Sequence, residues 1–161
     1  MASPTWIDDA LLAEVSREAR DNPRRRQNRN FHRMEDPVHR LLNALEPGTY
    51  IRPHRHLHPV KSETAIALAG EIGLLVFDDS GRVLASRRLS PGGPDRGADL
   101  PGGVWHTLVG LLPSSVFFES KPGPYAPPGP DELAPWAPPE GAPECAAIER
   151  GWRGLFPRSV R

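Results

Sequence analysis

The sequence predicts an all-β domain, an antiparallel sandwich or barrel with a helix before it and a proline-rich segment after it. Its 161 residues fit one domain. Between residues 50 and 120, six short runs rich in apolar residues are separated by turn-forming residues, a spacing typical of antiparallel strands. Nine of the 20 prolines lie between residues 122 and 143, which predicts an extended, non-helical tail.

The N-terminal part is expected to be an accessory helix followed by an arm. Leu11, Leu12, Val15 and Ala19 recur at helical spacing within residues 8–20, so they form an apolar face that must cover another element. The Asn-Pro pair at positions 22 and 23 ends this helix. Residues 24–35 show no periodicity and are interpreted as a polar loop. Residues 1–35 therefore form the predicted helix and arginine-rich arm.

Residues 38–45 fit two structures. The Asp-Pro pair at positions 36 and 37 is a typical helix start, and Val38, Leu41, Leu42 and Leu45 keep helical spacing. The Glu-Pro-Gly sequence at positions 46–48 ends this segment after barely two turns. Propensity alone favours a helix here.

The predicted strands are residues 50–56, 64–69, 72–77, 82–89, 103–111 and 115–120. Two connections have specific turn signals, at Gly70 and at the Asp-Asp-Ser-Gly sequence that ends in Gly81, where a positive φ is expected. Residues 36–125 are thus expected to form the β-barrel. Residues 126–161 are expected to form a strap packed across it, anchored by Trp136 and ending in a short helix within residues 144–156. The three segments together make one domain.

Charge and cysteine content exclude several classes of function. Lysine plus arginine and aspartate plus glutamate both number 20, so no overall field attracts nucleic acid or a membrane, although residues 17–33 hold seven arginines against two acidic residues. The apolar runs are too short to span a membrane, and the first ten residues do not resemble a signal peptide, so we expect a soluble, cytoplasmic protein. The single cysteine, Cys145, rules out a thiolate cluster, so a metal site would use imidazole and carboxylate ligands.

Three histidines alternate along the first predicted strand. Side chains of a strand alternate between its faces, so His54, His56 and His58 would point the same way, with neighbouring Cα atoms roughly 7 Å apart. Glu63 follows after a turn, and His106 lies on a later strand. Three nitrogens and one oxygen make an octahedral metal site with open positions. The plainer interpretation of such a pattern is a solvated strand face.

The glycines around these histidines resemble a known pattern. Residues 48–56, with Glu63 and Gly70, resemble the first cupin motif, G(x)5HxH(x)nE(x)6G, and residues 101–106 resemble the second, PxGxxH. Six residues separate His56 from Glu63, where three or four are commoner. Taking His56 and His58 as the HxH pair gives a gap of four residues, but no glycine then lies six residues ahead.

A narrower resemblance covers nearly the whole chain. Residues 22–26, 30–32, 38–41, 44–45, 48–50, 53–56, 119–125 and 134–136 are similar to the WbuC family of cupin-fold metalloproteins. The resemblance implies an antiparallel cupin (jelly-roll) β-barrel in which residues 38–45 are the first strand, against the helical propensity. It also implies His54, His56, Glu63 and His106 as the metal ligands, with His58 as a rim residue, substitute ligand or base.

The predicted function is that of a metal-binding cupin that acts on, or binds, a small polar ligand, either sugar-like or a carboxylate. Its cofactor would be one divalent ion of Fe, Mn, Ni, Co, Cu or Zn. An enzyme of this kind would be an isomerase or a dioxygenase, and the resemblance suggests a carbohydrate-related role. The alternative is a non-catalytic, metal-dependent binding or sensor module.

Further residues are expected around the ligand. Arg52 shares strand parity with the histidines, the polar arm is a candidate lid, and the end of the last strand faces the same mouth. His32 is a second candidate base beside His58. A homodimer is expected through the apolar residues of segment 72–77, with no nucleic-acid or membrane partner. The predicted ligand-binding residues are Arg26, Asn30, His32, Arg52, Lys121 and Tyr125.

Overall fold

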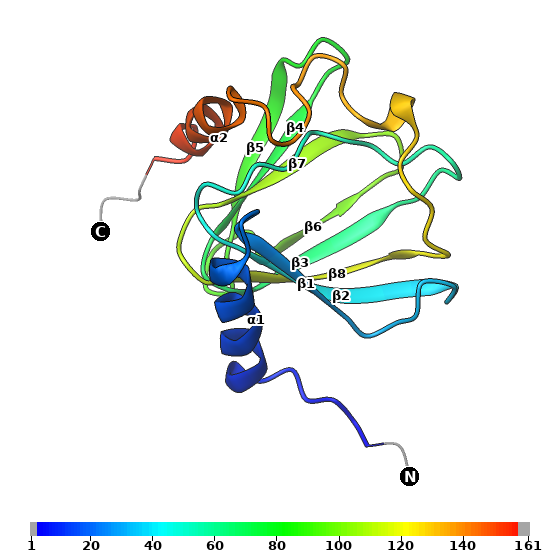
Figure 1. Ribbon diagram of the computed structural model, residues 1–161, viewed down its shortest axis with the longest axis vertical. Helices are drawn as coiled ribbons and strands as arrows, with labels where there is room; N and C mark the ends of the chain where they lie inside the picture. Colours follow the sequence, from blue (N-terminus) through cyan, green and yellow to red (C-terminus); the bar gives the residue numbers. More distant parts are fainter. Residues whose placement is uncertain (1–2, 158–161) are drawn as a thin grey trace.

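Two antiparallel β-sheets face each other in the computed structural model, which describes residues 3–157. Helix α1 (Asp9–Asp21) lies beside the larger sheet, and helix α2 (Cys145–Gly154) lies beside the smaller one (Figure 1). Both helices agree with the sequence prediction. In the described part of the chain, no helix is long and apolar enough to cross a membrane.

The larger sheet has five strands and the smaller has three. The larger has the order β1 (Arg26–Asn30), β2 (Val38–Leu45), β8 (Ser115–Pro122), β3 (Glu63–Ala69) and β6 (Gly97–Leu100). The smaller has the order β5 (Val83–Leu89), β4 (Ile72–Phe77) and β7 (Trp105–Gly110). All pairings are antiparallel, which confirms the predicted jelly-roll class. Over residues 3–157, the strand pairs form two sheets and not one closed ring.

Strand β2 shows why local propensity misleads. Leu42 and Ala44 contact Val15 and Ala19 of α1, whereas Leu45 lies in the core between the sheets. A strand buried on both faces loses the polar alternation that identifies a half-exposed strand. The helix favoured by propensity is therefore wrong, and the strand implied by the resemblance is confirmed.

Three other segments differ from the sequence prediction. Residues 24–35 are not simply a loop, because Arg26–Asn30 form the edge strand β1, which is held by backbone pairing with β2. All five side chains of β1 are polar, so no alternation of apolar and polar residues indicated a strand. Residues 50–56 form only isolated bridges at His54, to His106 and Leu133. Strand β6 was not predicted, since its four residues include Gly97 and Asp99.

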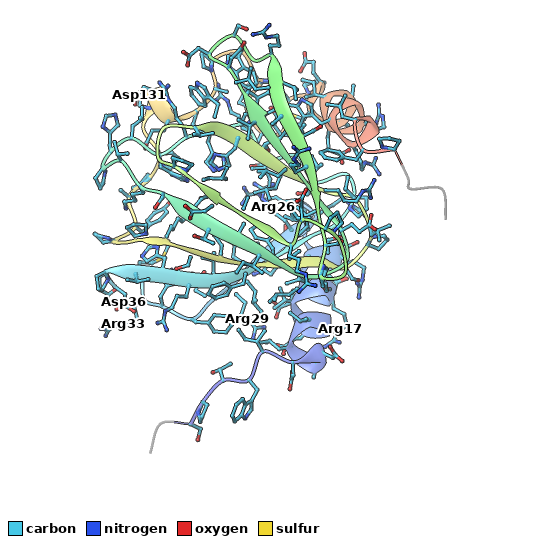
Figure 2. The ribbon with its side chains drawn as sticks, turned by 180° about the vertical axis from the view of Figure 1, so that it is seen from behind. Arg17, Arg26, Arg29, Arg33, Asp36 and Asp131 are labelled. Carbon is cyan, nitrogen blue, oxygen red and sulfur yellow. The ribbon has the colours of Figure 1, made fainter. Side chains whose placement is uncertain are left out.

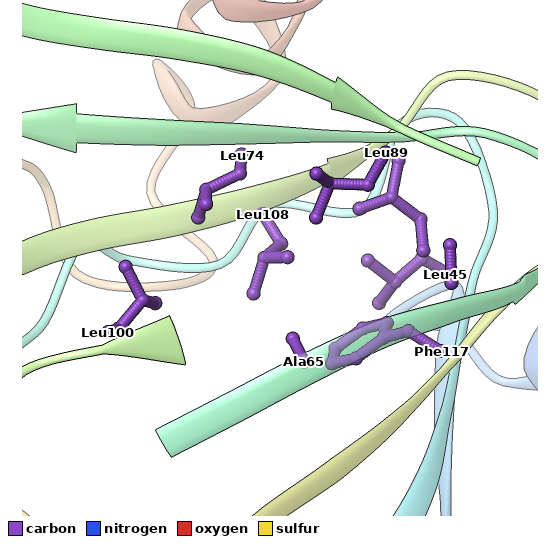
Figure 3. Packing of buried hydrophobic residues seen from close by; sticks show 9 residues of the cluster. Leu45, Ala65, Leu74, Leu89, Leu100, Leu108 and Phe117 are labelled. Carbon is purple, nitrogen blue, oxygen red and sulfur yellow. The ribbon is translucent and has the colours of Figure 1, made fainter. Parts of the chain in front are cut away.

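The core explains where a functional site can lie. Figure 3 shows the leucines of β2, β4, β5, β6 and β7 meeting Phe117 between the sheets. Because alternate residues share a face, the inward row of β8 continues from Phe117 to Glu119 and Lys121, and that of β7 runs from Leu108 back to His106. The space between the sheets is thus apolar at one end and polar at the other.

The outer face of the smaller sheet is covered by the C-terminal part of the chain. Leu75 and Phe77 of β4 pack with Trp105, and Trp136 and Trp152 lie against this cluster. Trp136 thus anchors the proline-rich strap (residues 126–144) on this sheet, as predicted. The face of residues 72–77 expected to pair two subunits is covered, so the predicted homodimer would need another surface.

One carboxylate clamps the strap to the N-terminal strand. Glu140 receives hydrogen bonds from Arg24 Nε and Nη2, both at 2.7 Å, and from Arg26 Nη2 at 2.8 Å. The bond from Arg24, followed by that from Arg26, lowers the pKa of Glu140 to about 2 from an ordinary 4.5. The ionised carboxylate is therefore stabilised in the folded protein.

This clamp gives stability a specific pH dependence. Since the folded-state pKa of Glu140 is depressed, its contribution is complete above 4.5 and disappears as the pH falls toward 2. We expect Glu140→Gln to lower the free energy of unfolding at neutral pH by about 1 kcal/mol, because the half-exposed ion pairs are screened by water. Urea unfolding should be measured at neutral pH and near pH 2. The free energies of unfolding of the wild type and Glu140→Gln should differ at neutral pH and become equal in acid. An equal difference at the two pH values would contradict the role of the Glu140 carboxylate.

Gly70 tests the predicted turn between β3 and β4. Its φ is +64°, and an added Cβ would lie 2.5 Å from Ser115 Oγ and 2.8 Å from Ser115 Cα. Gly70→Ala should therefore lower the free energy of unfolding by about 2 kcal/mol. Gly92→Ala is the matched control, because no atom lies within 4 Å of its Cβ position. Similar unfolding midpoints for the two variants would refute this account.

Candidate metal centre

His54 and His106 are brought together by the backbone. Their N–H groups donate reciprocally to each other's carbonyl oxygens at 3.0 Å, so residue 54 lies directly beside β7. His54 Nδ1 lies 3.2 Å from Arg52 O, and His106 Nδ1 lies 2.9 Å from Val104 O. When each Nδ1–H donates to its carbonyl, the Nε2 lone pair of each ring is left free to bind a metal ion.

Glu63 completes a cluster with the three imidazoles. It is the first residue of β3, and its Oε2 lies 3.0 Å from His56 Nε2 while its Oε1 lies 2.9 Å from His106 Nε2. One ligand atom from each of His54, His56, Glu63 and His106 lies within 4.8 Å of all the others. His106 Nε2 is buried without a hydrogen bond of acceptable geometry. An orphaned nitrogen of this kind, in an N3O donor set, fits a divalent transition metal.

The electrostatics favour the protonation states that a metal requires at His54 and Glu63. At His106, burial alone would lower the pKa, but the contact with Glu63 raises it. Burial lowers the pKa of His54 to about 3, so this imidazole is neutral at physiological pH. Burial alone would raise the pKa of Glu63, but the contacts with His106, His56 and Lys121 together hold it well below its ordinary value. Metal binding requires neutral imidazole and ionised carboxylate. His54 and Glu63 are therefore already in these states.

His58 lies outside the cluster. Its ring is exposed, and its Nε2 lies 2.7 Å from Oδ2 of Asp131, which belongs to the strap (Figure 2). This contact with Asp131 raises the pKa of His58. Of the two histidine pairs that the motif allowed, the structure gathers His54 and His56 around Glu63.

A cavity of about 650 Å³ opens onto these side chains. His54, His56 and Glu63 line it, as do four of the predicted ligand-binding residues, Arg26, Arg52, Lys121 and Tyr125. Arg52 donates from Nε and Nη2 to Ala134 O of the strap.

Asn30 and His32 do not line this cavity. They border a separate depression with Phe31 and Arg40, which corrects their predicted place at the mouth. The reason is local. His32 stacks on His39 at 3.9 Å between ring centroids, and its Nδ1 accepts from Arg40 N, so the ring is held away from the metal cluster. His32 is thus not a base inside the cavity. His58 does line the cavity, with its ring paired to Asp131.

The arginine-rich segment is not one basic surface. Arg29 pairs with Glu14 and Glu18 of α1, and Arg33 lies 3.5 Å from Asp36. Figure 2 shows Arg17, Arg26, Arg29 and Arg33 at separate places on the molecule. The local charge excess is divided among several ion pairs.

Sequence reasoning missed the residue that supports the ligand segment. Glu132, in the short 3-10 helix η1 (Pro130–Glu132) of the strap, is buried and accepts hydrogen bonds from Leu57 N at 2.6 Å, His58 N at 3.2 Å and Gly129 N at 2.7 Å. It therefore fixes the backbone that follows His56. No local pattern marks this glutamate, because its partners lie 75 positions away in the case of Leu57.

The comparisons with known proteins place the chain in a family. A family model described as "Domain of unknown function (DUF6016)" matches residues 7–89. The chain belongs to this family. A search of the curated proteins gives no match for this DUF6016 member.

Solved structures share the fold of this DUF6016 member at low identity. KdgF from Halomonas sp. is 20% identical over 65% of this chain and 84% of its own, with a TM-score of 0.51. The conserved SPY1581 protein of unknown function from Streptococcus pyogenes is 13% identical over 78% and 93%, with a TM-score of 0.52. CapF, solved with the inhibitor 3-isopropenyl-tropolone, is 19% identical over 65% of this chain and 30% of its own, with a TM-score of 0.50. The fold is the cupin fold predicted from the sequence.

Glu132 gives a test of how the strap supports the metal centre. Glu132→Ala leaves three backbone N–H groups without their acceptor and should lower the free energy of unfolding of this DUF6016 member by about 2 kcal/mol. It should also weaken metal binding, because the backbone after His56 is released. The neighbouring Asp131→Ala removes only the exposed contact with His58 and should change neither quantity. Thermal unfolding measures the change in stability, and metal titration measures the change in metal affinity. Equal effects of Glu132→Ala and Asp131→Ala would contradict the supporting role of Glu132.

Proposed function

We propose that this protein binds one divalent transition metal through His54, His56, Glu63 and His106 and uses it to hold a small polar ligand. The observation that carries the proposal is the convergence of these four side chains, from three separate segments, beside one cavity. Burying a carboxylate among imidazoles is costly unless the charges are compensated, and a metal ion compensates them. The resemblance to the WbuC family supports the same ligand set.

The metal would have room for a ligand. A transition metal with four protein donors has open coordination positions, where it acts as a Lewis acid on a bound oxygen. The chain's own residues would define what enters. Arg52 and Lys121 add positive charge to the cavity wall, and the wall also contains Tyr125, just before the strap, and Pro128 of the strap. A small ligand rich in oxygen atoms suits such a cavity.

The decisive measurement is metal content by elemental mass spectrometry on protein purified without a metal-affinity tag. We expect one metal ion per chain in the wild type. His54→Ala and His106→Ala each remove one of four donors and should reduce bound metal by at least about tenfold. His58→Ala is the matched control, because His58 pairs with Asp131 outside the cluster, and it should retain full occupancy.

Two results would contradict the proposal. One is a wild type that contains no transition metal and takes up none on reconstitution. The other is equal loss of metal from all three variants, which would show that the effect of His54→Ala and His106→Ala is not specific to the cluster.

A further inference from the structure

A second polar cluster lies in the same cavity, on the larger sheet. Asn43 of β2 and Glu119 and Lys121 of β8 all line it. Asn43 and Glu119 are each only 7% exposed. Glu119 was not recognised from the sequence, although its alternation with Phe117 on β8 is the signal that places it on the inward face.

The three side chains are joined but not fully satisfied. Asn43 Nδ2 donates to Glu119 Oε2 at 2.9 Å. Lys121 Nζ forms an ion pair with Glu119 Oε1 at 2.6 Å, yet this buried oxygen has no partner of hydrogen-bond geometry among the described residues. Lys121 Nζ also lies 3.8 Å from Glu63 Oε2, so the second cluster adjoins the metal centre.

The fold alone does not require this cluster. Leu45 and Phe117, one step further along the same inward rows, are apolar and belong to the core. A buried ion pair can often be replaced by hydrophobic residues of similar size without loss of stability. A carboxylate, an amide and an ammonium group kept at the wall of a cavity therefore point to a ligand.

The chemistry of the cluster selects one functional group. A ligand carboxylate placed there would face the negative charge of Glu119 and of Glu63, and an amine would face Lys121. A hydroxyl group is neutral and both donates and accepts, so it can donate to Glu119 Oε1 while accepting from Lys121 Nζ. Charge-assisted hydrogen bonds of this kind are the stronger ones.

We infer that Asn43, Glu119 and Lys121 form a hydroxyl-binding subsite beside the metal centre, and that the ligand is a polyhydroxylated compound. The inference rests on the proposed function, since the metal would hold another oxygen of the same molecule. Lys121 was already a predicted ligand contact. Its place between Glu119 and Glu63 gives it a defined role, that of donor to a ligand hydroxyl.

The test is calorimetric titration of the metal-loaded protein with two carboxylates of equal chain length. Gluconate carries hydroxyl groups along its chain and hexanoate carries none. The wild type should bind gluconate more tightly than hexanoate by about tenfold or more. The double variant Glu119→Leu with Lys121→Met removes both charges together and should lose this preference while folding normally. Glu119→Gln, which keeps the shape of the side chain, should weaken the binding of gluconate by about threefold.

The controls separate this inference from the metal site. Asn28→Ala removes an amide from the exposed part of the same cavity wall and should leave both affinities unchanged. Metal content, measured before and after titration, shows whether the metal centre itself has failed. With the metal in place, equal gluconate affinity in the wild type and both variants overturns the subsite, and so does hexanoate binding as tightly as gluconate. A wild type that holds no metal overturns the proposed function first and this inference with it.

Discussion

The buried carboxylate of Glu63 is the constraint on which this structure depends. A carboxylate that is 4% exposed must be compensated, and three imidazoles with Lys121 stand around it. To bring those groups together, the fold must place the start of β3 beside β7 and hold the segment containing His54 against both. The reciprocal backbone bonds between His54 and His106 hold this segment against β7 without a regular strand.

The polarity of the space between the sheets follows from strand alternation. The inward rows of β7 and β8 are apolar at one end, at Leu108 and Phe117, and polar at the other, at His106 and Lys121. The apolar end supplies hydrophobic stabilisation, and the polar end supplies ligands and hydrogen-bonding groups. The space between the sheets therefore serves both stability and binding. Every second residue of a strand points into this space, so one strand can supply apolar side chains at one end and polar side chains at the other.

The proline-rich strap contributes more to the site than its composition suggests. Its extended backbone carries acceptors at defined places, with Ala134 O for Arg52 and the Glu132 carboxylate for the backbone after His56. Glu140 then fixes it to the N-terminal strand through Arg24 and Arg26. Proline suits this task because it restricts the unfolded chain and leaves carbonyl oxygens free to accept.

The sequence by itself determined an antiparallel β fold, both helices and most strands, because apolar periodicity and turn residues are local signals. Its resemblance to the WbuC family implied the jelly-roll form and the four clustered donors. It misjudged β2, since a strand covered on both faces loses its alternation, and it missed polar β1, whose only support is pairing with a neighbour. Only the tertiary structure decided that His58 joins Asp131, that Asn30 and His32 lie outside the cavity, and that Asn43 of β2 donates to Glu119 of β8. These outcomes depend on which segments pack together over long sequence separations, and no local pattern of residues carries that information.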